Sequence, residues 1–160
     1  MSGTLVGGIG NVFLGDDGFG VEVVRRLASR RPRRGVHIAD FGIRSLDVVY
    51  ALLDDYDDVI LVDAMPRGKA PGTLYVLEPS RGVRATPGLA AHGFAPAQAL
   101  ALAEQLGGTA ERRIRIVGCE PASIPREGDV HVGLSEPVAD GVERAVTLIE
   151  ELLEGQGADA

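Results

Sequence analysis

The sequence has very few of the residues that would cross-link it or place it in a membrane. Among its 160 residues there is one cysteine, Cys119, so the chain cannot form an internal disulfide or a zinc site of several thiolates. No apolar run approaches the roughly 20 residues that a membrane-spanning helix needs. The start of the chain also lacks the basic and apolar blocks of a secretory signal. These absences predict a cytoplasmic protein.

Basic charge is scarce as well. Lys69 is the only lysine, and 16 basic residues face 23 acidic ones, which gives a net charge of −7. An acidic chain of this kind is a poor binder of nucleic acid. Six arginines do lie close together, and we interpret them as the solvated face and end of the first helix rather than as a phosphate site. They are Arg25, Arg26, Arg30, Arg31, Arg33 and Arg34.

Short apolar stretches with the pattern of strands alternate along the chain with stretches that have the pattern of amphipathic helices. The length predicts a single domain over residues 1–154, with residues 155–160 as a disordered tail. Alternating strands and helices predict an α/β fold, a three-layer sandwich in which a mainly parallel, twisted sheet has helices on both faces. The predicted strands span residues 4–9, 36–39, 59–62, 73–77 and 114–117, and the predicted helices span about 21–31, 45–53, 96–106 and 135–153.

Polar side chains follow several of the predicted strands. Asp16 and Asp17 come after the first strand, Asp40 after the second and Asp63 directly after the third. His92 lies in a later loop. In open α/β sheets, sites form beyond the carboxyl ends of the strands, where the strand order reverses. We therefore expect Asp17 and Asp63 to share one crevice, with the loop of His92 reaching over it.

Two carboxylates and an imidazole can hold a divalent ion and leave positions open for water or substrate, which suits hydrolysis. Without a metal, one of two neighbouring carboxylates would keep its proton and could act as an acid. Structural interpretations stay open, because one of Asp16 and Asp17 is expected to cap the next helix or lie in its first turn. We interpret His37 and Cys119 as structural, and His131 as structural or at the rim of the site.

Motifs for other kinds of chemistry are incomplete. Residues 8–13 begin like a dinucleotide fingerprint, but the third glycine is missing. The only lysine precedes Ala70, so there is no Walker A motif, and neither Gly-x-Ser-x-Gly nor His-Glu-x-x-His occurs. A phospho-acceptor receiver domain would need a lysine after its last strand, where Cys119 and Glu120 stand instead. The carboxylates and His92 therefore remain the best candidates for chemistry.

Short motifs rich in glycine and aspartate follow one another between about residues 4 and 150. They are Gly8-Ile9-Gly10-Asn11, Leu14-Gly15-Asp16-Asp17-Gly18-Phe19-Gly20-Val21, Asp40-Phe41-Gly42, Val62-Asp63-Ala64, Pro71-Gly72-Thr73, the loop of His92, Val117-Gly118 and Gly133-Leu134-Ser135-Glu136-Pro137-Val138. In order and spacing these motifs resemble the hydrogenase maturation endopeptidases, which process the large subunits of nickel-iron hydrogenases. The first motifs, with their spacing to Asp63 and His92, carry most of the resemblance.

The resemblance implies a twisted sheet between helices and an aspartate-based endopeptidase that removes a C-terminal peptide from a nickel-loaded precursor. The metal-facing, catalytic residues of the family fall on Asp17, Asp63 and His92. Asp40 and, more weakly, Asp16 would contribute to substrate recognition. The nickel would arrive with the precursor, whose cysteine thiolates suit it better than carboxylates do. A water activated by the metal or by a carboxylate would attack, with no covalent nucleophile.

The resemblance also implies limits on partners. The precursor is the expected partner, with no nucleic acid, membrane or nucleotide cofactor, and the protein is expected to be a monomer. Two alternatives remain: a related peptidase with another protein substrate, which would bind metal tightly by itself, and a non-catalytic nickel-sensing chaperone or scaffold. The scaffold would bind the precursor without shortening it.

Overall fold

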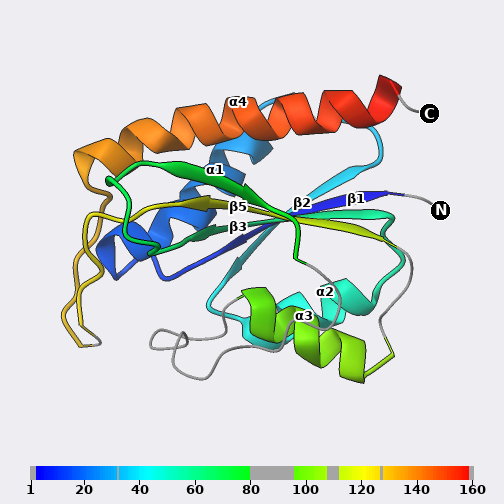
Figure 1. Cartoon of the computed structure of the whole chain (residues 1–160), viewed down its shortest axis with the longest axis horizontal. Helices are drawn as coiled ribbons and strands as arrows, with labels where there is room; N and C mark the ends of the chain where they lie inside the picture. Colours follow the sequence, from blue (N-terminus) through cyan, green and yellow to red (C-terminus); the bar gives the residue numbers. More distant parts are fainter. Residues whose placement is uncertain (1–2, 32, 80–95, 108–111, 127, 159–160) are drawn as a thin grey trace.

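Strands and helices alternate along the chain as predicted (Figure 1). The structure, a computed structural model, describes residues 3–31, 33–79, 96–107, 112–126 and 128–158. The elements are β1 (Thr4–Ile9), the 3-10 turn η1 (Gly15–Gly18), α1 (Phe19–Ala28), β2 (Val36–Gly42), α2 (Ser45–Leu53), β3 (Asp58–Ala64), β4 (Leu74–Leu77), α3 (Pro96–Gln105), β5 (Arg113–Cys119) and α4 (Glu136–Ala158).

The five strands form one sheet in the order β2-β1-β3-β5-β4. β1 pairs in parallel with both β2 and β3, and β3 pairs in parallel with β5. β4 alone is antiparallel, on the edge beside β5. The strand order reverses between β1 and β3, because the chain goes to one side of β1 for β2 and to the other side for β3. The predicted, mainly parallel sheet with β1 and β3 as neighbours is confirmed.

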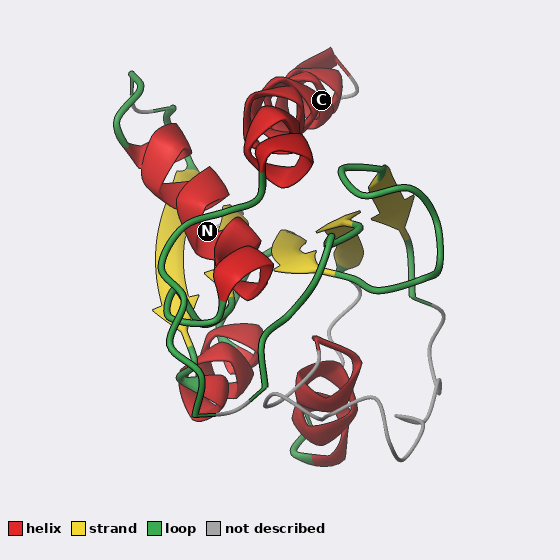
Figure 2. Cartoon of the chain, turned by 90° about the vertical axis from the view of Figure 1, so that its left-hand side faces the viewer, coloured by secondary structure: helices red, strands yellow, loops and turns green. Residues whose placement is uncertain are grey.

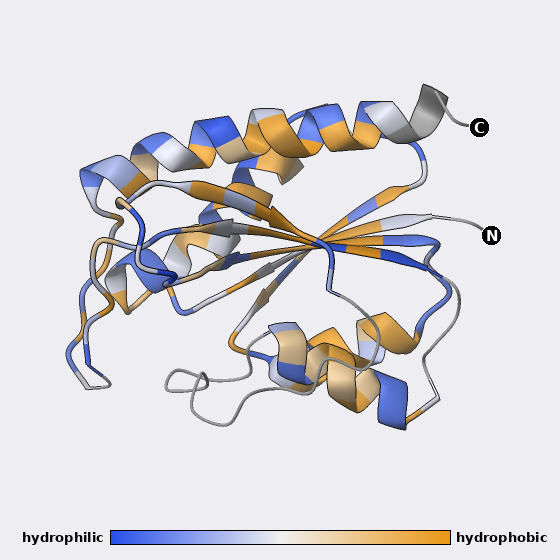
Figure 3. Ribbon diagram, viewed as in Figure 1, coloured by the Kyte–Doolittle hydropathy of each residue, from blue (hydrophilic) through white to orange (hydrophobic). Residues whose placement is uncertain are grey.

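Helices cover both faces of the sheet, with α1 and α4 on one face and α2 and α3 on the other (Figures 1 and 2). The alternation of side chains along β3 explains both packed layers. Ile60 and Val62 pack in the cluster that includes α1 and α4, whereas Val59 and Leu61 pack in the cluster that includes α2 and α3. A strand covered on both faces reads as a continuous apolar run, and hydrophobic colouring accordingly concentrates in the strands (Figure 3).

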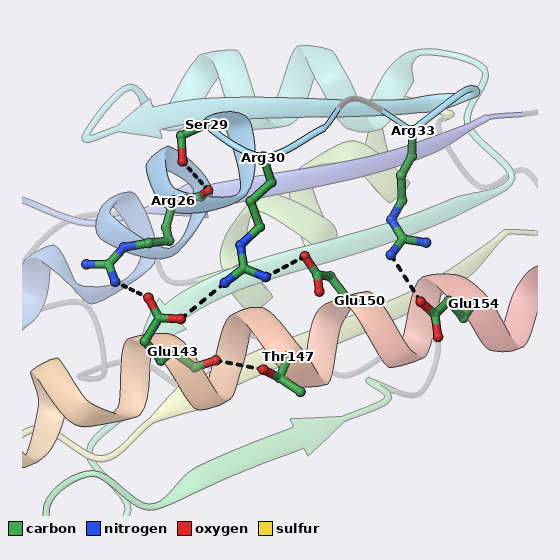
Figure 4. Close-up of polar contacts among 8 residues, drawn as sticks. All are labelled: Arg26, Ser29, Arg30, Arg33, Glu143, Thr147, Glu150 and Glu154. Atoms are coloured by element: carbon green, nitrogen blue, oxygen red, sulfur yellow. Dashed lines mark hydrogen bonds and ion pairs between the residues drawn. The ribbon is translucent and has the colours of Figure 1, made fainter.

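Ion pairs join α1 and the segment that follows it to the exposed side of α4 (Figure 4). Arginines that the sequence placed at the face and end of the first helix meet glutamates of the last helix, so their interpretation as a solvated surface is confirmed. Each exposed pair contributes little to stability, about 0–1 kcal/mol. The pairs are Arg26–Glu143, Arg30–Glu143 (3.2 Å), Arg30–Glu150 (3.1 Å) and Arg33–Glu154 (3.2 Å).

The last helix is longer than predicted. α4 continues to Ala158, past Leu153, so the segment predicted as a disordered tail begins as helix. The glycines at 155 and 157 favour an earlier end, but tertiary contacts oppose it, since Leu153 is buried in the core and Glu154 pairs with Arg33. Within the described ranges, neither α4 nor any other helix is long and apolar enough to cross a membrane.

Candidate active site

Two glycines allow η1 to approach the carboxyl ends of β1 and β3 closely. Gly10 has φ +145°, which L side chains rarely adopt, and a Cβ there would clash with the main-chain oxygen of Asp17. A Cβ at Gly20, in the first turn of α1, would clash with the main-chain oxygens of Ile9 and Val62. The backbone approach that these glycines permit brings Asp17 to the end of β3.

Asp17 and Asp63 lie together at this point, where the strand order reverses. Asp17 is buried in η1, and its Oδ2 accepts a hydrogen bond from the amide of Asn11 at 2.9 Å. Asp63 is the next-to-last residue of β3 and is partly buried. Burial and, next, the negative charge of Asp17 raise the pKa of Asp63 well above its ordinary value. Two of the three predicted site residues are therefore close enough to interact.

The carboxylate pair can serve hydrolysis in two ways. A carboxylate without a proton can accept one from water, and a neighbour with a raised pKa can donate one. A divalent cation also fits between the two groups, because it would relieve their repulsion and bind oxygen donors. Among the described residues, no group of three or more His, Cys, Asp and Glu side chains could hold a metal ion. His92, the predicted third member, lies outside the described residues.

Asp16 is buried and bonded within the protein. Its carboxylate accepts hydrogen bonds from the amides of Ala122 (2.8 Å), Ser123 (3.5 Å) and Ser135 (2.7 Å), and from the Ser135 hydroxyl (2.8 Å). Asp16 therefore fastens η1 to the loop between β5 and α4. This geometry supports a structural role rather than the substrate contact predicted for it, and Asp16 is left out of the proposed site.

Asp40 lies at the same carboxyl-terminal end of the strands as the carboxylate pair. It lies near the end of β2, beside Gly8 of β1, and its side chain is partly exposed. Its Oδ2 lies 3.4 Å from the Nε of Arg25. A partly exposed carboxylate at this edge could meet a substrate, so its predicted role in recognition stays a prediction.

Glu120 has a role that the sequence did not reveal. Its buried carboxylate accepts hydrogen bonds from the amides of Arg67 (2.9 Å) and Lys69 (2.8 Å) and from the Tyr75 hydroxyl (2.7 Å). Burial alone would raise the pKa of Glu120, but these hydrogen bonds outweigh burial and lower it. Glu120 thus holds the loop that directly follows Asp63. An acidic residue just after a strand was the only signal, and its partners lie far away in sequence.

The interpretations of Cys119 and His37 are confirmed. Cys119 is fully buried, and burial is the main cause that raises the pKa of its thiol to about 11, so it is a poor nucleophile. His37 is exposed on the edge strand β2, with its ring centroid 6.4 Å from that of Tyr56. Neither side chain therefore competes with the carboxylate pair as the centre of chemistry.

Comparison with protein families matches residues 21–152 to HycI, described as hydrogenase maturation protease. The chain belongs to this family. A similar protein is the hydrogenase expression/formation protein HupM of Azotobacter chroococcum mcd 1, 33% identical over 156 residues that cover 96% of this protease and 72% of HupM. The hydrogenase 2 maturation protease of Escherichia coli K12 is 29% identical over 163 residues, which cover 98% of this protease and 93% of that one.

Solved structures agree with the family assignment. The hydrogenase maturating endopeptidase HybD from E. coli superposes with a TM-score of 0.77 and 26% identity, over 97% of this protease and 94% of HybD. The HycI protease from Thermococcus kodakarensis KOD1 gives a TM-score of 0.74 and 27% identity, over 95% of this protease and 92% of HycI. The fold class and the peptidase activity that the resemblance implied are therefore confirmed.

Proposed function

We propose that this protease removes a C-terminal peptide from the nickel-loaded large-subunit precursor of a nickel-iron hydrogenase. The observation that carries the proposal is the interacting pair Asp17 and Asp63 at the point where the strand order reverses. The relatives' names, which refer to hydrogenase maturation, support this class of substrate. We include His92 as the third metal-facing residue, on the strength of the sequence resemblance.

The nickel belongs to the substrate in this proposal. Thiolates of the precursor hold it, and the harder oxygen ligands of Asp17 and Asp63 engage positions that the thiolates leave open. A contact of this kind positions the C-terminal segment of the precursor at the crevice. Cleavage would then depend on metal insertion, because a nickel-free precursor would lack the group that orients it.

The carboxylate pair supplies the proton transfers of peptide hydrolysis. Water attacks the scissile carbonyl carbon while an ionised carboxylate accepts a proton from it. The carbon–nitrogen bond then breaks, and the carboxyl that accepted the proton from water passes it to the leaving amine. The pKa that Asp63 has without a metal is raised, and it would fall on nickel binding because the cation favours the ionised carboxylate, so both carboxylates can then act as ligands and bases.

The test is the intact mass of a matched, nickel-loaded precursor incubated with the protease. The wild-type chain should remove a short C-terminal peptide, and Asp17→Asn or Asp63→Asn should slow the reaction by about 100-fold or more. Asp140→Asn, an exposed change of equal charge on α4, is the control and should leave the rate unchanged.

Three results would contradict parts of the proposal. Equal cleavage of nickel-loaded and nickel-free precursor would contradict the proposed dependence of cleavage on nickel. Normal rates for both Asp17→Asn and Asp63→Asn would show that the site is elsewhere. Complex formation without loss of mass would favour a chaperone or scaffold over a peptidase acting on this substrate.

A further inference from the structure

A parallel bridge between two short segments, here called the ribbon, lies next to η1, which carries Asp17. Leu14 and His131 form an isolated parallel bridge between the segment that enters η1 and the loop that joins β5 to α4. The amide of His131 donates to the oxygen of Phe13 at 2.8 Å, and the amide of Gly15 donates to the oxygen of His131 at 2.7 Å. Figure 1 shows the loop from β5 to α4, coloured yellow to orange, at the end of the sheet where β1 and β3 terminate.

The ribbon carries three exposed apolar side chains. Phe13 precedes Leu14 in the bridge, and Val130 and Val132 flank His131. Leu14 is buried, whereas the exposed fractions of Phe13, Val130 and Val132 are 57%, 74% and 70%. Gathered apolar side chains with such exposure are characteristic of a surface that binds a partner.

The ribbon also has a free main-chain edge. Both main-chain polar groups of His131 bond to residues 13 and 15, and in a strand the groups of its neighbours point the other way. Within the described part of the chain, the main-chain groups of Val130 and Val132 have no hydrogen-bond partner. Proteins usually protect such edges with charge or proline, because a free apolar edge invites pairing with another chain. Here the two flanking residues are valines.

The edge is fixed relative to the candidate active site. Asp16 bonds to Ala122 and Ser135 on the loop that carries the edge, and Asp16 is adjacent to Asp17 in η1. The two main-chain hydrogen bonds of His131 connect the same loop to Phe13 and to Gly15, the first residue of η1. A segment bound along the edge would therefore have a defined position with respect to Asp17.

We propose that the edge Val130–Val132 binds an extended, apolar segment of the precursor as an added strand, next to the point of cleavage. The free main-chain groups would pair with the segment, and Phe13, Val130 and Val132 would cover its apolar side chains. The inference rests on the proposed function, because the occupant is the precursor. Continuity with η1 favours this occupant, since a peptidase must hold its substrate extended beside the groups that cut it.

Steady-state cleavage of the nickel-loaded precursor tests the docking edge. The double variant Val130→Ser/Val132→Ser should raise KM by about tenfold or more, because the two valine side chains together lose apolar contact worth at least this factor. kcat should change less than about twofold. Val132→Pro, which removes a free donor and no internal hydrogen bond, should also raise KM.

The control is Leu106→Ser, a change at a residue 60% exposed just after α3, at the opposite end of the sheet, and its KM should equal that of the wild type. Circular dichroism melts of all variants show whether each is folded. Cleavage by the wild-type chain with an unchanged KM in both edge variants would overturn the docking edge alone. Absence of cleavage by the wild-type chain would overturn the proposed function and this inference together. A wild-type dimer that dissociates in the double variant would also overturn the inference, because the edge would then bind a second copy of the chain.

Discussion

At the scale of single residues, the ionised carboxylate of Asp63 should lower the stability of the folded protein. Burial and the charge of Asp17 raise its pKa, so the folded protein binds this proton more tightly than the unfolded chain does. The free energy of unfolding should therefore fall as pH rises from about 4, the ordinary pKa of aspartate, through the raised pKa of the folded state. Active sites that hold buried, repelling charges commonly lower the stability of the folded protein in exchange for activity.

Asp63→Asn removes the charge and should stabilise the protein while abolishing cleavage. We expect a gain on the order of 1 kcal/mol at neutral pH, within the usual range of single substitutions, and a smaller difference at pH 4. Urea unfolding at both pH values measures it. Asp140→Asn should leave stability nearly unchanged at both. A less stable Asp63→Asn variant would contradict the assigned repulsion.

Cys119 gives a second prediction at the same scale. Because burial raises the pKa of its thiol to about 11, the folded protein holds almost no thiolate at pH 8. Alkylation by iodoacetamide should be very slow in the folded protein and fast after unfolding in urea. Mass spectrometry of the adduct follows both rates. Rapid alkylation of the folded chain at pH 8 would indicate a reactive, accessible thiol.

At the scale of elements, Glu120 connects β5 to the loop after β3. Glu120→Gln keeps the shape but weakens the acceptor of the Arg67 and Lys69 amides, and should cost about 1–3 kcal/mol at pH 7. The pKa of Glu120 is lowered in the folded state, so its stabilising contribution is present above pH 4.3 and lost as pH falls through the folded pKa.

Urea unfolding of the wild-type and Glu120→Gln proteins at pH 7 and pH 3 measures this linkage. The difference between them should be smaller at pH 3, because this carboxyl is then mostly protonated in the unfolded chain and the stabilising contribution of its charge declines. A difference of the same size at both pH values would mean that the charge of Glu120 does not stabilise the loop.

Asp58 and Arg115 connect β3 to β5 at the other end of the sheet. Their side chains are 10% and 3% exposed and lie 2.8 Å apart. Burial raises the pKa of Asp58 despite the opposing charge of Arg115. Arg115→Ala should cost about 3–5 kcal/mol, because it leaves a buried charge without its partner.

Replacing both partners of this pair should cost far less. Asp58→Leu/Arg115→Met exchanges the ion pair for apolar packing, which is often neutral or stabilising. A double-mutant cycle based on urea unfolding measures the coupling between the two sites. A double variant as unstable as Arg115→Ala would mean that apolar side chains cannot fill this space.

At the scale of the whole molecule, the sequence was sufficient to predict the order of elements and the closeness of Asp17 and Asp63. Continuous apolar runs such as residues 59–62 marked the central strands, and the polar residues after β1 and β3 marked the site. Spacing alone could not separate Asp16 from Asp17, since the two are adjacent in sequence and similar in chemistry, and only the family resemblance favoured Asp17 for the site. The partners of Asp16 lie 106 to 119 positions away. The C-terminal end of α4 was also not predicted. Contacts with residues far away in sequence outweigh the low helix propensity of the glycines there.

The hydrogen bonds of Asp16 also determine how late in folding the candidate site is completed. During synthesis, Asp17 and Asp63 leave the ribosome long before Ser135, yet η1 is fastened only when Ser135 and the loop before it have arrived. Contacts of such long sequence separation form late, because loop closure must precede them. A nascent or partly unfolded chain therefore carries both carboxylates without a finished site. On the proposed function, cleavage competence is therefore a property of the completed molecule.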